Sequence, residues 1–169
     1  LADDIRFIRG LGGDPAGVQV IPDWNPSFPP PIDLEARRVE VLAALLDGSA
    51  ALTIAPLDAV KAPLITPAVF RGLLRTLSRG DAVGRENLIA WLVEAGYEMV
   101  STVTLPGEAV VRGGIIDCFT PLADSPVRIE LDGDDVASLR LVDPLTQRSK
   151  RYVDSVRLGP APGHVHDDE

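Results

Sequence analysis

The sequence predicts a mixed α/β and α+β protein, in which a partial parallel α/β piece is followed by a helix packed on a mainly antiparallel sheet. Two observations carry this prediction. Residues 1–64 alternate strand and helix patterns in the strand–helix–strand order that is typical of parallel sheets. After residue 96, short apolar segments follow one another and are separated by turn residues. We therefore expect a partial α/β domain at 1–64, an α+β module at 65–158 and an acidic tail at 159–169.

The first region contains a helix between two short apolar runs, at residues 18–21 and 51–55, which we expect to be buried strands. Asp33 is suited to cap the helix and Gly48 to end it. The residues expected on its apolar face are Leu34, Val41, Leu42 and Leu45. A proline-rich loop precedes the helix, and we interpret its Trp24 as a lid over the α/β piece, with a partner contact as the alternative.

In the remainder of the chain we expect one well-marked helix and six strands. The helix ends at Gly96, and its apolar residues recur at the spacing of one helix face: Leu88, Trp91, Leu92 and Ala95. Strands are expected at 97–105, 108–112, 115–120, 127–131, 136–141 and 151–158. The fourth and fifth strands alternate apolar and polar residues, as in a hairpin with one solvent-exposed face. Arg128 and Glu130 lie on that face, where solvent or a partner can reach them.

Composition and charge exclude several classes of function. The net charge of −9 makes the chain a poor primary DNA binder, because such affinity comes from Lys and Arg neutralising phosphates. A protein partner is therefore the better expectation. No apolar stretch approaches the roughly 20 residues that span a bilayer. The single cysteine, Cys118, excludes an internal disulfide and is consistent with a reducing cytoplasm. A chain that begins at Leu1 rather than Met suggests a segment of a larger protein.

None of the residue patterns that carry catalysis or cofactor binding is found. The phosphate-binding pattern G-x-x-x-x-G-K-[ST] is absent. Both histidines, His164 and His166, lie in the acidic tail, so no Ser-His-Asp arrangement is expected, and two imidazoles on a frayed terminus make a poor metal site. Cys118 falls in an apolar strand and is interpreted as a core residue rather than a nucleophile. We expect no catalysis, no cofactor and no metal in this segment.

Arg112 and the two glycines after it are the remaining candidates. Gly113 and Gly114 lie between two β-rich runs and are interpreted as a bulge or a tight strand connection. A long cation at Arg112 has room to project from the sheet there, either toward a partner or into a surface ion pair of little energetic value. From the residues alone, both interpretations of Arg112 stay open.

Residues 106–121, which read PGEAVVRGGIIDCFTP, resemble the signature strand pair of the bacterial transcription-repair coupling factor family. The segments 127–130 and 143–149 continue the pattern of that family in order and at the right spacing. Upstream, residues 21–24 and 95–97 also match. The resemblance covers about residues 1–160, and it is specific because several separated motifs agree in order.

This resemblance implies a fold and a partner. In the family, this region is similar to the excision-repair protein UvrB: a RecA-like remnant of its first domain flanks an inserted module whose sheet docks onto UvrA. The ATP-driven DNA translocase lies elsewhere in the polypeptide, so DNA and RNA polymerase would be contacted only through the rest of the parent. Arg112 is carried over as a UvrA contact, whereas Val110 stands where UvrB typically has a second arginine. Arg128 and Glu130 follow as further partner-binding residues.

Two other hypotheses remain open at this point. The α/β pattern of residues 1–64 permits a degenerate nucleotide-binding half-domain of an ATP-dependent DNA translocase, whose phosphate-binding loop lies upstream of Leu1. Alternatively, another part of the parent protein covers the docking face, which would make the segment an autoinhibitory clamp.

Overall fold

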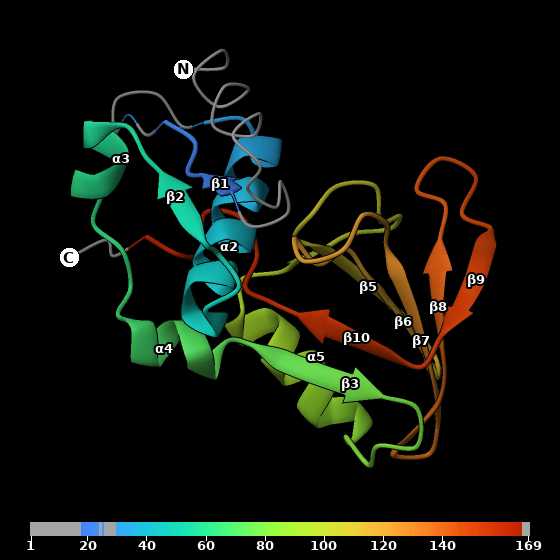
Figure 1. The fold of residues 1–169 in the computed structure, drawn as a ribbon. Helices are drawn as coiled ribbons and strands as arrows, with labels where there is room; N and C mark the ends of the chain where they lie inside the picture. The colour runs from blue at the N-terminus through green and yellow to red at the C-terminus, as the bar shows by residue number, and fades with distance from the viewer. Residues whose placement is uncertain (1–17, 24, 26–29, 167–169) are drawn as a thin grey trace.

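The structure is a computed structural model that describes residues 18–23, 25 and 30–166 (Figure 1). Figure 1 shows two neighbouring parts, one built around helix α2 and the other around a six-stranded sheet. This arrangement confirms the mixed α/β class. Trp24, which the sequence predicts to be a lid, lies outside the described residues.

The first part contains the predicted strand–helix–strand unit. Strand β1 (Val18–Val20) pairs in parallel with β2 (Leu52–Ile54), and α2 (Ile32–Asp47) connects them. Gly48 ends the helix as predicted, with a φ of 69° that favours glycine. Two short helices follow, α3 (Leu57–Lys61) and α4 (Pro67–Gly72). The parallel pair is confirmed, and its two strands form a sheet of their own.

Two details predicted for α2 are wrong. Pro31, not Asp33, occupies the N-cap position, and no side chain caps the helix there. Asp33 lies in the first turn, where its negative charge still favours the helix dipole. Of the predicted apolar face, Val41 is buried but Leu34 and Leu45 are exposed. The face is displaced because α2 packs on α4 and on the C-terminal residues rather than on β1 and β2 alone.

The second part begins with β3 (Arg75–Ser78), which pairs antiparallel with β10 (Ser155–Leu158) near the end of the chain. Helix α5 (Arg85–Glu94) follows β3. The predicted helix is confirmed, and Leu88 and Leu92 on it are fully buried. The strand expected at 151–158 is divided at Asp154, so its second half leaves the main sheet and joins β3. The partner strand β3 was not predicted.

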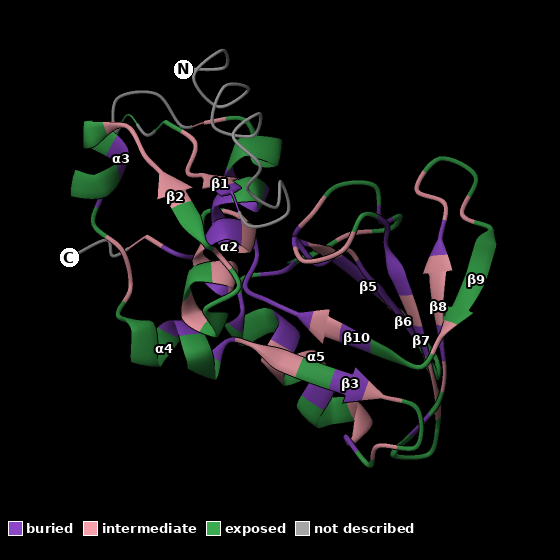
Figure 2. Ribbon diagram, viewed as in Figure 1, coloured by how far each residue is buried: buried purple, intermediate pink, exposed green. Residues whose placement is uncertain are grey.

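The six-stranded sheet has the order β4-β5-β6-β7-β8-β9, and every pair is antiparallel except β4–β5. Its strands are β4 (Glu98–Met99), β5 (Glu108–Arg112), β6 (Ile115–Cys118), β7 (Val127–Asp132), β8 (Asp135–Val142) and β9 (Ser149–Val153). The predicted hairpin is β7–β8. Figure 2 shows the contrast between the buried central strands and the exposed edge strand β9.

Side chains alternate between the two faces of this sheet. One face, with Ile116, Ile129 and Leu139, joins Leu88 and Leu92 of α5 in the main core. The opposite face, which we call the outer face, carries Arg112, Asp117, Arg128, Glu130, Arg140 and Tyr152. The alternation predicted for the hairpin is therefore confirmed, and the outer face is the polar one.

The histidines do not lie on a frayed terminus, so that prediction is wrong for residues 164–166, the part of this end that the structure describes. Val165 is fully buried, and its carbonyl accepts a hydrogen bond from the Ile65 amide at 3.1 Å. The His166 Nε2 atom lies 3.0 Å from a carboxylate oxygen of the buried Glu35. Apolar residues at Ala161 and Val165 hold this segment in place, a signal that the acidic composition of its end concealed.

Candidate protein interface

The three residues predicted to bind a partner lie on the same face of the sheet. Arg112, the last residue of β5, is paired in register with Ile115, and Ile115 is paired with Glu130 of β7. Two strand spacings therefore separate Arg112 from Glu130, about 10 Å. Arg128 precedes Glu130 by two residues on β7 and so points to the same side. The structure brings the three residues together on the outer face.

Arg112 lies at the exposed end of β5. Its guanidinium donates a hydrogen bond to the carbonyl oxygen of Ser101. Among the described residues no carboxylate pairs with it. The surface ion pair considered as the alternative is thus not formed within this part of the chain, and the positive charge of Arg112 remains available.

The two glycines after Arg112 form a tight connection between β5 and β6, as the sequence predicts. Gly113 has a φ of 61°, in the left-handed region. A Cβ atom on Gly114 would come within 3.0 Å of the Leu131 carbonyl oxygen, so a side chain there would push β7 away. The glycines let the turn close while β7 approaches it, which leaves Arg112 at the rim of the sheet.

Arg128 is held by a buried carboxylate. Its Nε and Nη2 atoms donate to the two carboxylate oxygens of Asp117 at 2.7 and 2.8 Å. The Asp117 side chain is 2% exposed and that of Arg128 is 20% exposed. The hydrogen bonds that Arg128 donates to Asp117 raise the pKa of Arg128 above its ordinary value, against the opposing effect of burial. Arg128 is therefore a fixed, partly buried cation rather than a fully solvated one.

Glu130 belongs to a second cluster on the outer face. Its Oε2 atom accepts hydrogen bonds from the Ser138 hydroxyl at 2.6 Å and from Arg140 at 2.7 Å. The Arg140 guanidinium in turn lies over the ring of Tyr152, 4.6 Å from its centroid. Cation–aromatic contacts of this kind favour a fixed stacking of the two groups.

Sequence analysis missed Asp117, Arg140 and Tyr152 as members of the site. Asp117 was not named as a candidate, although strand alternation places it on the strand next to that of Arg112 and on the same face. Arg140 falls on the polar side of the predicted hairpin, so the apolar/polar alternation of the strand at 136–141 was the signal that could have identified it. Tyr152 had no signal, because its pairing with Arg140 depends on the register of β8 with β9.

Cys118 is fully buried, as predicted, and burial raises its thiol pKa to about 12, so it is un-ionised at neutral pH. Within the described ranges, no cluster of three His, Cys, Asp or Glu side chains is placed to hold a metal ion. In the same ranges, no helix combines the length and apolarity needed to cross a bilayer.

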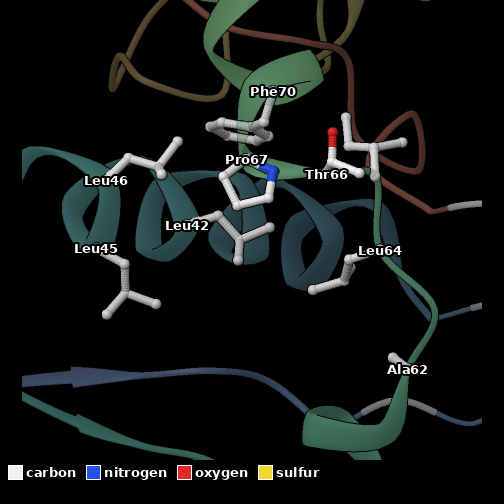
Figure 3. A pocket seen from close by; sticks show the side chains of 9 residues that line it. Leu42, Leu45, Leu46, Ala62, Leu64, Thr66, Pro67 and Phe70 are labelled. Atoms are coloured by element: carbon white, nitrogen blue, oxygen red, sulfur yellow. The ribbon is translucent and has the colours of Figure 1, made fainter.

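A separate apolar hollow of about 530 Å³ lies in the first part of the molecule (Figure 3). Its lining residues come from α2, α4 and the segment before α4, and none carries an ionisable side chain: Leu42, Leu45, Leu46, Ala62, Leu64, Ile65, Thr66, Pro67 and Phe70. This hollow offers apolar contact only. It shares no residue with the outer face of the sheet.

Comparison with known proteins identifies the sheet region. The model of the UvrB interaction domain family matches residues 76–164. The chain is 36% identical over 129 residues to the transcription-repair-coupling factor of Bacillus subtilis (strain 168), a match that covers 76% of this chain and 11% of that protein. It is also 36% identical over 136 residues to the transcription-repair-coupling factor of Staphylococcus aureus (strain USA300), covering 80% of this chain and 12% of that protein.

The matches confirm the resemblance to transcription-repair coupling factors, of which the chain spans roughly a tenth of the length. The region matched by the family model contains α5, the whole six-stranded sheet and β10. It therefore includes every residue of the outer face named above, and it covers more than half of the chain. The chain belongs to the UvrB interaction domain family.

Proposed function

We propose that this chain is the docking module of a bacterial transcription-coupled repair factor and that the outer face of its sheet binds UvrA. The observation that carries the proposal is the state of Arg112. It is an exposed arginine on the polar face of a rigid sheet, and no carboxylate within the described residues neutralises it. The role is one of recognition in the cytoplasm and requires no chemistry from these residues.

The neighbours of Arg112 support a recognition role. Arg128 and Glu130 on the same face are each held by hydrogen bonds to fixed partners, Asp117 for Arg128 and Arg140 for Glu130. Side chains that are fixed before binding lose little conformational entropy when a partner arrives. Arginine is also enriched among the few interface residues that dominate affinity.

Isothermal titration calorimetry tests the proposal by measuring the affinity of UvrA for this chain and for its Arg112→Ala variant. We expect the wild-type chain to bind and the variant to lose about 2–4 kcal/mol of binding free energy, as for an arginine that is an interface hot spot. The melting curve should not change, because Arg112 is exposed and its side chain makes a single hydrogen bond to the described part of the chain. Arg71→Ala is the matched control, since Arg71 is an exposed arginine on α4, away from the sheet.

The outcomes separate the function from the residue. Wild-type chain that fails to bind UvrA contradicts the proposed function. If the wild-type chain binds UvrA, and both Arg112→Ala and Arg71→Ala keep its affinity and its melting temperature, only the role assigned to Arg112 is contradicted.

A further inference from the structure

One row of side chains crosses the outer face from β5 to β9. The strand register places Val110 opposite Asp117, Asp117 opposite Arg128, Arg128 opposite Arg140 and Arg140 opposite Tyr152. Side chains paired in this way on one face lie close enough to interact directly. The row therefore links a buried carboxylate in the middle of the sheet to an aromatic ring at its edge.

Exposure increases from Asp117 in β6 to Tyr152 at the edge of the sheet. The side chain of Asp117 is 2% exposed, that of Arg128 20% and that of Arg140 27%. Tyr152 at the end is 68% exposed. An approaching protein would meet the ring of Tyr152 first, whereas Asp117 could be reached only by rearranging the sheet. The exposed end is the part of the row available for recognition.

The charges next to this ring are already compensated. Arg128 is paired with Asp117 and Arg140 with Glu130, so two cations are matched by two anions. Together with Glu130 from the neighbouring row, these side chains present no net charge to a partner, unlike Arg112 at the rim. What the row offers instead is the exposed aromatic ring of Tyr152. The ring is held in place because the Arg140 guanidinium lies over it, 4.6 Å from its centroid, and Arg140 itself donates a hydrogen bond to Glu130 at 2.7 Å.

We infer that Tyr152 is an aromatic anchor of the docking surface and that Arg140 is the residue that positions it. This inference rests on the proposed function and extends the surface from β5 to the edge strand β9. Tyrosine and arginine are the residue types that most often dominate interface affinity. A tyrosine ring that is stacked before binding also gives up little freedom on association.

The inference specifies the chemistry of the partner. The UvrA surface that fits this face carries an apolar recess for the ring of Tyr152 and a carboxylate for Arg112. Binding near Tyr152 then depends weakly on salt, because the adjacent ion pairs are internal to the chain, whereas the contact with Arg112 is screened as salt rises.

Titration of UvrA with variants of Tyr152 tests the inference. We expect Tyr152→Ala to weaken binding about tenfold to thirtyfold without lowering the melting temperature, since the residue is exposed. Tyr152→Phe keeps the ring and should stay within about threefold of wild type. Leu145→Ala is the control, because Leu145 is 91% exposed in the loop between β8 and β9.

A double-mutant cycle tests the positioning role of Arg140. If Arg140 acts through the ring, Arg140→Gln should weaken binding in the wild-type background and have little further effect when combined with Tyr152→Ala. If the loss of binding free energy in the double variant equals the sum of the losses in the two single variants, the positioning role is overturned. A merely structural role of Arg140 would lower the melting temperature instead and would leave the affinity of the folded protein unchanged.

Failure of this inference can be told from failure of the proposed function. If wild-type chain binds and Arg112→Ala weakens it, but Tyr152→Ala binds as wild type does, the anchor is overturned and the docking role stands. If Tyr152→Phe loses as much affinity as Tyr152→Ala, the ring is not the anchor. If wild-type chain does not bind UvrA, both fall.

Discussion

The two parts of this molecule differ in how much core their described residues form. The sheet region shares one cluster of 17 buried apolar residues, drawn mainly from α5, the sheet and the β3–β10 pair. Among the residues that the structure describes, the region around α2 has a cluster of four: Val39, Ala43, Phe70 and Val165. It also exposes seven large apolar side chains between residues 32 and 69, and it contains the open apolar hollow. The region that carries the proposed docking face is thus the one best able to hold side chains in fixed positions.

Each part also contains a buried ion pair, and the two pairs are satisfied to different degrees. Asp117 receives two short hydrogen bonds from Arg128. In α2, by contrast, Glu35 and Arg38 approach only to 3.8 Å. Glu35 Oε1 and the Nε and Nη1 atoms of Arg38 are buried without a hydrogen bond in the described part of the chain. Burial accordingly lowers the pKa of Arg38, with the charge of Glu35 opposing it. A buried pair stabilises a fold only when its hydrogen bonds are made.

The largest effect is expected in the main core. Leu92→Ala removes a fully buried side chain of α5 and should lower the free energy of unfolding by about 2–5 kcal/mol. Val93→Ala, next to it but 58% exposed, is the control and should change stability by about 0.5 kcal/mol or less. Urea denaturation of both variants measures the difference. Equal losses would mean that α5 does not pack on the sheet as described.

The next effect concerns the satisfied ion pair. Asp117→Ala leaves the guanidinium of Arg128 without its two acceptors and should cost about 1–3 kcal/mol of unfolding free energy. Asp124→Ala, at an exposed position in the loop between β6 and β7, serves as the control. If chemical denaturation gives the same midpoint for both variants, the pair does not stabilise the outer face.

The unsatisfied ion pair should matter less. Arg38→Met combined with Glu35→Gln removes both charges of the pair. Within the described residues, the Arg38 guanidinium donates two hydrogen bonds, to loop carbonyls at 3.1 and 3.3 Å. The lost bonds and the relieved burial of charge oppose one another, so we expect a change within about 1 kcal/mol. A loss in urea denaturation as large as that of Asp117→Ala would remove the contrast between the two parts.

The smallest effect is expected at Glu108, at the start of β5. Burial acts to raise its pKa, but hydrogen bonds from the Thr104 and Leu105 amides at 2.6 and 2.8 Å, with one from the Thr104 hydroxyl at 3.1 Å, hold it below the ordinary value. A carboxylate with a lowered pKa adds stability at pH values above its unfolded pKa, and this is lost as the pH falls through the folded value.

Glu108→Gln should therefore cost less than about 1 kcal/mol at neutral pH and nothing once the pH is below the folded pKa of Glu108. Unfolding curves of wild type and variant from neutral to acidic pH measure this convergence. A difference that persists unchanged into acid would show that the charge of Glu108 does not contribute.

Local patterns predicted much of the fold, while pairing between distant segments was beyond them. Alternation identified β7 and β8, short apolar segments between turn residues identified β5 and β6, and helical spacing identified α5. The strand at 151–158 was predicted as continuous, since nothing local shows that residues after Asp154 leave the sheet to join β3. The packing of Val165 on α2 has the same cause: it depends on a contact across more than a hundred residues.

The site followed the same rule. Strand alternation placed Arg128 and Glu130 on one face, and the family resemblance added Arg112, which the strand register puts on the same face. The sequence could not show that Arg128 and Glu130 are already hydrogen-bonded within the chain, because these bonds depend on side chains of neighbouring strands. The same limit concealed Tyr152, whose stacking on Arg140 follows from the register of β8 with β9.

Hydrogen–deuterium exchange of the chain with and without UvrA tests the central claim most directly, because it compares both parts of the molecule in one measurement. If the outer face is the docking surface, UvrA should slow exchange at its accessible rim, in the β5–β6 turn at Gly113 and along the edge strand β9. Residues 32–72 should exchange at the same rate in both samples. Slowed exchange confined to residues 32–72, with the rim and β9 unchanged, would contradict the account.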